Sequence, residues 1–215
     1  MKLLRLRDTV LTKDSVVVHF IRHGQAHHNV HNKFNSSPDR ISHYLKRDFY
    51  DAKLTPLGLT QALCINVDVD LIIVSPLSRA LETAIPLAKK NNCSVHISDN
   101  AREANVLNNF PCNRRKKLED VFDYLSDCEI EVINHLELQT DNEDPFADQN
   151  KVQSSEELDK QLHDLMLEIK QLGIFYKNIA VISHSITISS IMNKYSMDKY
   201  SYIKNCEVLS TILTY

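Results

Sequence analysis

Short runs of consecutive apolar residues recur along the chain, and polar or turn-forming residues bound each of them. These runs have the length and β-branched content of strands buried on both faces of a sheet. The longest runs are at residues 16–21, 70–75 and 179–183, with weaker ones at residues 94–98 and 208–215. The pattern therefore predicts a central sheet that is mostly parallel, with a terminal strand at residues 208–215.

Helical periodicity separates these runs. The segment 54–62 begins a helix that Thr55 can cap, with Pro56 at its first position. Three further helices are predicted at 77–84, at 186–194 and from a cap at Ser154 or Ser155 to Leu172. The helix at 77–84 is expected to kink or end near Pro86. A short helix after a loop is predicted at 110–117. Alternating strands and helices predict an α/β fold: one three-layer domain over residues 1–215, with helices on both faces of the sheet.

Composition narrows the class of protein. Hydrophobic residues make up 43% of the 215 residues and the formal net charge is −3, so no basic footprint for nucleic acid or a membrane surface is predicted. We identify no signal peptide and no apolar run of membrane-spanning length. The five cysteines are scattered and form no C-x-x-C pair, which favours reduced thiols and a cytoplasmic protein.

Basic side chains follow three of the predicted strands. Arg22 and His23 end the first strand, Arg79 comes after the strand at 70–75, and His184 directly follows the strand at 179–183. Because the carboxyl ends of parallel strands meet at one edge of a sheet, these side chains are expected to converge. Two guanidinium groups and two imidazoles form a suitable pocket for a dianionic phosphate, and Gly24 would allow an anion to approach the backbone closely.

Five motifs in the same order resemble the histidine phosphatase superfamily, in its phosphoglycerate-mutase-like branch. They are IRHGQAHHN (21–29), LTPLGLTQA (54–62), SPLSRALETA (75–84), ARE (101–103) and VISHS (181–185). A softer likeness of residues 111–115 to a loop of some fungal and plant members suggests that sub-branch. The resemblance implies a phosphoglycerate mutase-like fold and no cofactor.

The resemblance also implies roles for individual residues. His23 would be the nucleophile that forms a phosphohistidine, and Glu103 would be the proton donor, unless Glu103 simply pairs with its neighbour Arg102. The groups expected to bind or stabilise the phosphate are Arg22, Asn29, Arg79, His184 and Gln25. For Asn29 and Gln25, a helix cap or a loop position remains an equal alternative. No metal site is expected, although His27, His28 and His31 lie close together in the sequence.

The sequence departs from the family at Ser185, where a glycine usually follows the second histidine, and it lacks the long loop that mutases use to close over their substrate. The absence of that loop favours a metal-independent phosphomonoesterase that acts on a small phosphorylated substrate or a phosphopeptide. The alternatives are a bisphosphate-primed sugar-phosphate mutase and a phospholigand-binding protein without turnover. The regions 30–53 and 105–117 should decide the substrate, and whether the basic run 114–117 contacts it stays open, as does the oligomeric state.

Overall fold

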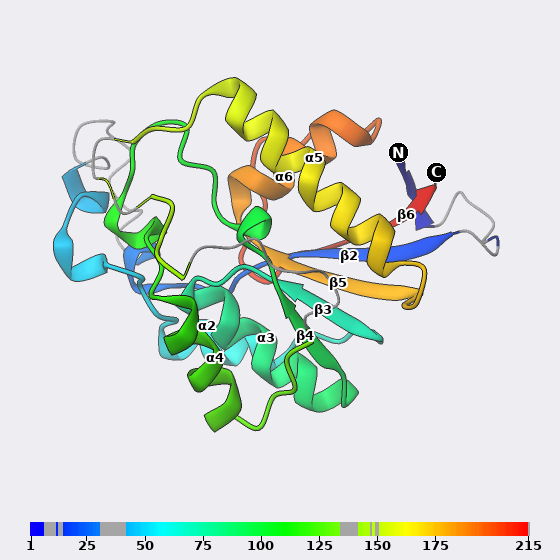
Figure 1. Ribbon diagram of the computed structural model, residues 1–215, viewed down its shortest axis with the longest axis horizontal. Helices are drawn as coiled ribbons and strands as arrows, with labels where there is room; N and C mark the ends of the chain where they lie inside the picture. Colours follow the sequence, from blue (N-terminus) through cyan, green and yellow to red (C-terminus); the bar gives the residue numbers. More distant parts are fainter. Residues whose placement is uncertain are drawn as a thin grey trace.

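A computed structural model describes residues 1–6, 12, 15–30, 42–133, 142–146, 148 and 151–214. Its six strands form one sheet in the order β1-β6-β2-β5-β3-β4 (Figure 1). The strands are β1 (Lys2–Arg5), β2 (Val16–Arg22), β3 (Leu71–Val74), β4 (Ser94–Ile97), β5 (Asn178–Ser183) and β6 (Val208–Thr214). Pairing is parallel from β2 through β5 and β3 to β4, whereas β6 runs antiparallel to both β1 and β2.

All five predicted strands are present. Strand β1 was not predicted, because it has only two leucines between two charged residues and is too short to show a period. It forms through pairing with β6 at the other end of the chain, where Lys2 faces Thr214.

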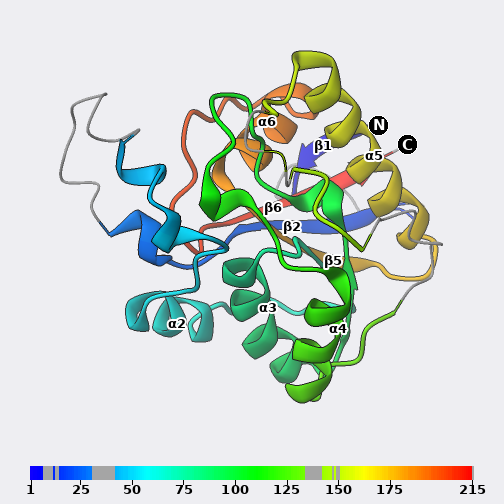
Figure 2. The ribbon, with the colours of Figure 1, turned by 60° about the vertical axis from the view of Figure 1, so that its left-hand side comes forward.

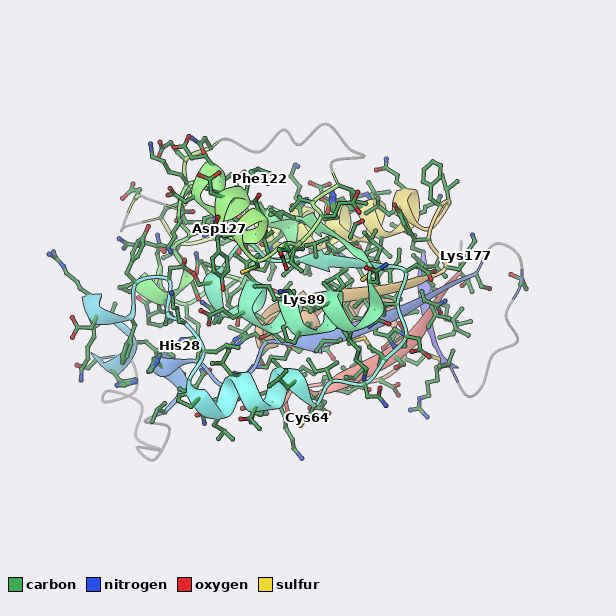
Figure 3. All side chains as sticks on the ribbon, turned by 90° about the horizontal axis from the view of Figure 1, so that it is seen from below. His28, Cys64, Lys89, Phe122, Asp127 and Lys177 are labelled. Atoms are coloured by element: carbon green, nitrogen blue, oxygen red, sulfur yellow. The ribbon has the colours of Figure 1, made fainter. Side chains whose placement is uncertain are left out.

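Helices cover both faces of the sheet (Figures 1 and 2). Two of them, α5 (Ser155–Leu172) and α6 (Ser185–Tyr195), lie on one face. The other face carries α2 (Pro56–Leu63), α3 (Ser78–Asn91) and α4 (Leu118–Asp127), and Figure 3 views the molecule from this side. The α/β architecture with two helical layers is therefore as predicted.

Side chains that alternate along the strands build a separate core on each face. Phe20, Ile73 and Val181 belong to the cluster beneath α5 and α6. Their chain neighbours Ile21, Ile72 and Ile182 belong to the cluster with α3 and α4. This period of two is the ordinary geometry of a strand, and burial on both faces explains why the strands read as continuous apolar runs.

Two predicted helix caps are confirmed. The Thr55 hydroxyl accepts from the Gly58 amide at the start of α2, and Ser154 forms a capping box with Glu157 at the start of α5.

Two helical predictions differ from the structure in where a helix ends or begins. Helix α3 does not end near Pro86 but continues to Asn91, because Leu81, Ala84, Leu87 and Ala88 are buried around the proline. Their burial offsets the roughly 3 kcal/mol cost of an interior proline. The helix expected at 110–117 is instead a single turn, Pro111–Asn113, and the true helix α4 begins at Leu118.

The carboxyl ends of β2, β3 and β5 point to the side of the sheet opposite the two chain termini (Figure 1). None of the helices in the described ranges combines the length and apolar character needed to cross a bilayer.

Candidate active site

Sheet register places the two histidines side by side. Strands β2 and β5 pair in parallel with Arg22 opposite Ser183, so the next residue of each strand is a histidine. The His23 amide donates to the Ser183 carbonyl at 3.0 Å, and the ring centroids of His23 and His184 are 5.0 Å apart. The predicted meeting of these imidazoles, residues 161 positions apart in the chain, is therefore a direct result of strand pairing.

The first turn of α3 delivers Arg79. The buried Asp51 carboxylate accepts from the Ser78 amide at 2.8 Å and from the Ser78 hydroxyl at 2.6 Å, which holds the N-terminus of the helix in place. Arg79 Nε then lies 3.2 Å from His23 Nε2 and donates to it. Arg79 also donates to the Cys112 carbonyl and, at 2.9 Å, to Asn113 Oδ1.

Glu103 reaches the site from the loop that follows β4. The Ser183 hydroxyl donates to the Ala101 carbonyl at 2.7 Å and so ties this loop to the end of β5. Glu103 Oε1 accepts from the backbone amides of Thr187 at 3.2 Å and Ala104 at 3.1 Å. Arg102 turns away to Asp144, so the alternative in which Glu103 pairs with Arg102 does not describe this structure.

Two glycines allow the loop after β2 to contact helix α2. A Cβ on Gly24 would lie 2.6 Å from the Gly58 carbonyl oxygen, and a Cβ on Gly58 would lie 2.1 Å from the Gln25 carbonyl oxygen. The space left by the missing Cβ of Gly24 is therefore occupied by the backbone of Gly58, and not by an anion as expected from the sequence. This contact presses the loop that carries His23 against α2, and the Gly24 amide donates to Thr83 of α3 at 3.0 Å.

A cavity of about 360 Å³ opens at this edge of the sheet. Of the residues predicted from sequence, those that line it are Arg22, His23, Asn29, Arg79 and Glu103. His184 lies beneath the cavity and is fully buried, in contact with His23. Gln25 is not among the lining residues, and its side-chain carbonyl accepts from the Thr55 hydroxyl at 2.9 Å.

Burial keeps the histidines neutral. Desolvation lowers the pKa values of His23, His28 and His184 well below 6.5, and the charges of Arg79 and Arg22 lower them further. His23 Nδ1 lies 2.6 Å from the Gly24 carbonyl oxygen. Because a carbonyl only accepts, Nδ1 carries the proton and Nε2 keeps its lone pair.

The environment of Glu103 favours its protonated form. Burial raises the pKa of the Glu103 carboxyl, although Arg79, Arg22 and the two backbone donors act in the opposite direction. A carboxyl that holds its proton at higher pH is suited to act as a general acid.

Three of the buried nitrogen atoms without a partner belong to this site. Arg22 Nε, His28 Nδ1 and His184 Nδ1 are buried without a hydrogen-bond partner in the described part of the chain. His184 Nε2 contacts the Ser75 hydroxyl at 2.9 Å. Polar groups buried in this way are costly unless a bound ligand satisfies them.

Several cavity residues were not predicted as ligand contacts. The sequence favours a solvated or substrate-adjacent side chain for His28 over a metal ligand, and no signal in it distinguishes His28 from His27; in the structure, His28 is 5% exposed and lines the cavity. The remaining lining residues come mostly from the segments that connect the strands and long helices, with Ser185 at the start of α6; they include Tyr44, Phe110, Asn113, Ser185 and Tyr202.

The basic run 114–117 contributes none of the cavity lining. Arg115 is 1% exposed and binds Asp99 with two hydrogen bonds of 3.0 Å. Within the described ranges, no group of three or more His, Cys, Asp or Glu side chains is arranged to hold a metal ion, and His31 lies outside those ranges.

Comparison with known proteins matches part of the chain to one protein family. Residues 18–109 match the family model of the histidine phosphatase superfamily (branch 1). A 77-residue stretch is 39% identical to phosphoglycerate mutase-like protein 2 of Arabidopsis thaliana and covers 32% of this chain. That match spans 21% of the Arabidopsis protein.

Solved structures share the fold at low sequence identity. The phosphoglycerate mutase of Bacillus anthracis str. Sterne superimposes with a TM-score of 0.59 at 15% identity, over 93% of this chain and 88% of the other. The ecdysone phosphate phosphatase of Bombix mori, in complex with tungstate, gives 0.58 at 14% identity, over 90% and 87% of the two chains. At such identities, the likeness establishes the architecture alone.

Proposed function

Because residues 18–109 match the family model of the histidine phosphatase superfamily (branch 1), we propose that this chain is a metal-independent phosphomonoesterase that forms a phosphohistidine on His23 and uses Glu103 as the proton donor. The observation that carries the proposal is the pair of buried guanidinium groups beside His23. Arg22 and Arg79 are 6% and 1% exposed, yet no carboxylate forms an ion pair with either within the described ranges. A dianionic phosphate supplies the missing charge.

The state of His23 supports its role as nucleophile. Its Nε2 lone pair is free of a proton, and Arg79 Nε lies 3.2 Å from that atom. In the first step, the Nε2 lone pair forms the N–P bond while the P–O ester bond breaks with its electron pair on the alkoxide. Arg22, Arg79 and His184 stabilise the negative charge on the phosphoryl oxygens during this transfer.

Glu103 acts in both steps. Its proton goes to the leaving alkoxide, which departs as the alcohol. The resulting carboxylate then takes a proton from the water that attacks phosphorus, the N–P bond breaks, and His23 is restored with inorganic phosphate as the product. Thr187 and Ala104, which donate to the same carboxyl oxygen, keep the group in position through both steps.

The test is hydrolysis of p-nitrophenyl phosphate in the presence of EDTA. The wild-type protein should turn over, and His23→Ala should lose on the order of 10⁶ in kcat, because nucleophile and supporting groups act as a unit. His163→Ala, at an exposed position of α5, is the matched control and should keep full activity.

Full activity in His23→Ala, or complete loss of wild-type activity in EDTA, would contradict the proposal. Turnover that requires added 2,3-bisphosphoglycerate would instead indicate the mutase. Phosphate binding without any turnover would indicate the phospholigand-binding alternative.

A further inference from the structure

The cavity is lined by more than the residues assigned to the phosphate and the neutral polar side chains around them. Five large apolar or aromatic side chains also line it, and we name this set the outer cavity: Tyr44, Leu107, Phe110, Ile186 and Tyr202. They come from four separate segments of the chain, so no single run of sequence reveals them.

Two aromatic contacts organise the outer cavity. The rings of Tyr44 and Phe110 lie 5.4 Å apart in a tilted arrangement. The Tyr202 ring lies 5.0 Å from the Arg22 guanidinium, so this aromatic group adjoins the phosphate end directly. A ligand whose phosphate reaches Arg22 therefore has its next atoms among aromatic faces.

The outer cavity also keeps apolar surface open to solvent. Leu107 is 71% exposed and Tyr202 is 55% exposed, although both line the cavity. Contact with the apolar part of a bound molecule would remove this surface from water, which favours such a ligand by roughly 25 cal/mol per Å² buried.

The charges around the cavity exclude a second anionic group. In the described part of the chain, the charged side chains that line it are Arg22, Arg79 and Glu103. Both arginines adjoin His23 and serve the phosphate, and Glu103 would repel another anion when ionised. A carboxylate or second phosphate in the outer cavity would therefore be desolvated without a cation to pair with it.

We propose that the substrates are phosphate monoesters of alcohols that carry an aryl or arylalkyl group and no second negative charge. This inference rests on the proposed phosphatase function for its catalytic readout, whereas its binding prediction holds independently of turnover.

The first experiment compares kcat/KM for 2-phenylethyl phosphate, glycerol 3-phosphate and 3-phosphoglycerate. All three release an alkoxide of an aliphatic alcohol, so differences report on the cavity and not on an activated leaving group. We expect 2-phenylethyl phosphate to be preferred over each of the others by roughly tenfold or more, the scale on which hydrophobic pockets discriminate. Equal values, or a preference for 3-phosphoglycerate, would overturn the inference and leave the phosphatase proposal intact.

Substitution of an exposed wall residue tests the site directly. Leu107→Ser should raise KM for 2-phenylethyl phosphate several-fold and leave inhibition by inorganic phosphate unchanged. Leu63→Ser is the matched control, because Leu63 is 70% exposed on α2 and does not line the cavity. An unchanged KM in Leu107→Ser would contradict the assignment of the outer cavity.

Binding of a non-hydrolysable probe separates this inference from the catalytic proposal. Calorimetry with 2-phenylethylphosphonate and with 2-carboxyethylphosphonate, on the His23→Ala protein, needs no turnover. Tighter binding of the phenyl compound supports the inference even if hydrolysis is absent. Equal or weaker binding would refute it even if the protein is an active phosphatase.

Discussion

Two pairs of buried arginines in this protein have opposite surroundings. Arg102 and Arg115 are each 1% exposed, and their guanidinium groups meet carboxylates: Arg102 binds Asp144 at 2.6 Å, and Arg115 binds Asp99. Arg22 and Arg79 are buried to a similar degree but contact neutral groups, such as the Ile203 carbonyl at 2.7 Å from Arg22. Burial lowers the pKa of Arg79, and the charge of Arg22 lowers it further, although Glu103 and Asp51, which form no ion pair with it, act in the opposite direction.

The difference shows which buried cations have a structural role and which leave room for a ligand. A desolvated charge is costly, and the first pair offsets that cost with carboxylates from the protein. For the second pair, the desolvation cost is not offset in the free protein, because the compensating charge must come from an anion that binds reversibly. The basic run 114–117 is conspicuous in the sequence but belongs, through Arg115, to the structural pair.

Among the tests of this comparison, the largest expected effect concerns Glu103, the carboxylate that could make the two pairs alike if it were ionised beside Arg22 and Arg79. Glu103→Gln keeps a carbonyl oxygen for Thr187 and Ala104 but removes the proton donor. We expect kcat on 2-phenylethyl phosphate to fall ~10²–10⁴-fold, with a much smaller loss on p-nitrophenyl phosphate, whose leaving group needs little protonation. Equal losses on both substrates would show that Glu103 is not the acid.

Next in size is the loss of a structural arginine. Arg115→Met removes the guanidinium that donates two hydrogen bonds to the Asp99 carboxylate, so we expect the free energy of unfolding to drop by about 3–5 kcal/mol. Urea denaturation measures this, and kcat at a temperature where the variant remains folded should stay close to wild type. A fully stable variant would mean that the ion pair is dispensable.

The matched substitution in the pair formed by Arg22 and Arg79 should lower activity and leave stability nearly unchanged. In Arg79→Met, a group that stabilises the phosphoryl charge is lost, so kcat/KM should fall about 10²–10³-fold. The free energy of unfolding should stay within about 1 kcal/mol or rise, because the removed charge had no carboxylate partner. Destabilisation as severe as that of Arg115→Met would erase the distinction between the pairs.

A bound anion should stabilise the protein through Arg22 and Arg79, the pair without carboxylate partners, and not through Arg102 and Arg115. Inorganic phosphate at 100 times its Kd should raise the free energy of unfolding by about 2.7 kcal/mol, visible as a higher Tm. Arg22→Met should lose this response, and Arg115→Met should keep it from a lower starting Tm. If the two variants responded equally, the anion would bind elsewhere.

The smallest effect is on pH dependence. Burial, together with the charges of Arg79 and Arg22, keeps the nearby His28 neutral. The folded-state pKa of His28 is lowered below its unfolded value of about 6.5, so its contribution to stability is complete above that pH and is lost as the pH falls. His28→Gln should therefore reduce the slope of unfolding free energy against pH, between pH 6.5 and 5, by up to ~1.4 kcal/mol per pH unit. An unchanged slope would show that His28 protonates equally in both states.

The interior of the fold was predictable because strong local patterns encode it. The strands β2, β3 and β5 lie in continuous apolar runs, and α5 has a cap and a helical apolar stripe. Predictions failed where pairing between distant segments decides the structure, as for β1, or where burial outweighs a local signal, as for Pro86.

The candidate site divides in the same way. Arg22, His23, Arg79 and His184 could be identified because each follows a strand directly or within one helical turn. The positions of Tyr44, Phe110 and Tyr202 could not, because loop side chains acquire their neighbours from packing that leaves no periodic trace.

The amino-acid sequence alone determined which strands are buried and which basic residues lie at or after their ends, since both depend on neighbours close in the chain. Only the tertiary structure decided which arginines receive a carboxylate, which nitrogen of His23 bears the proton and which apolar groups wall the cavity. Those properties depend on contacts between residues far apart in the chain, and the electrostatic cost of burying a charge becomes visible only once those contacts are known.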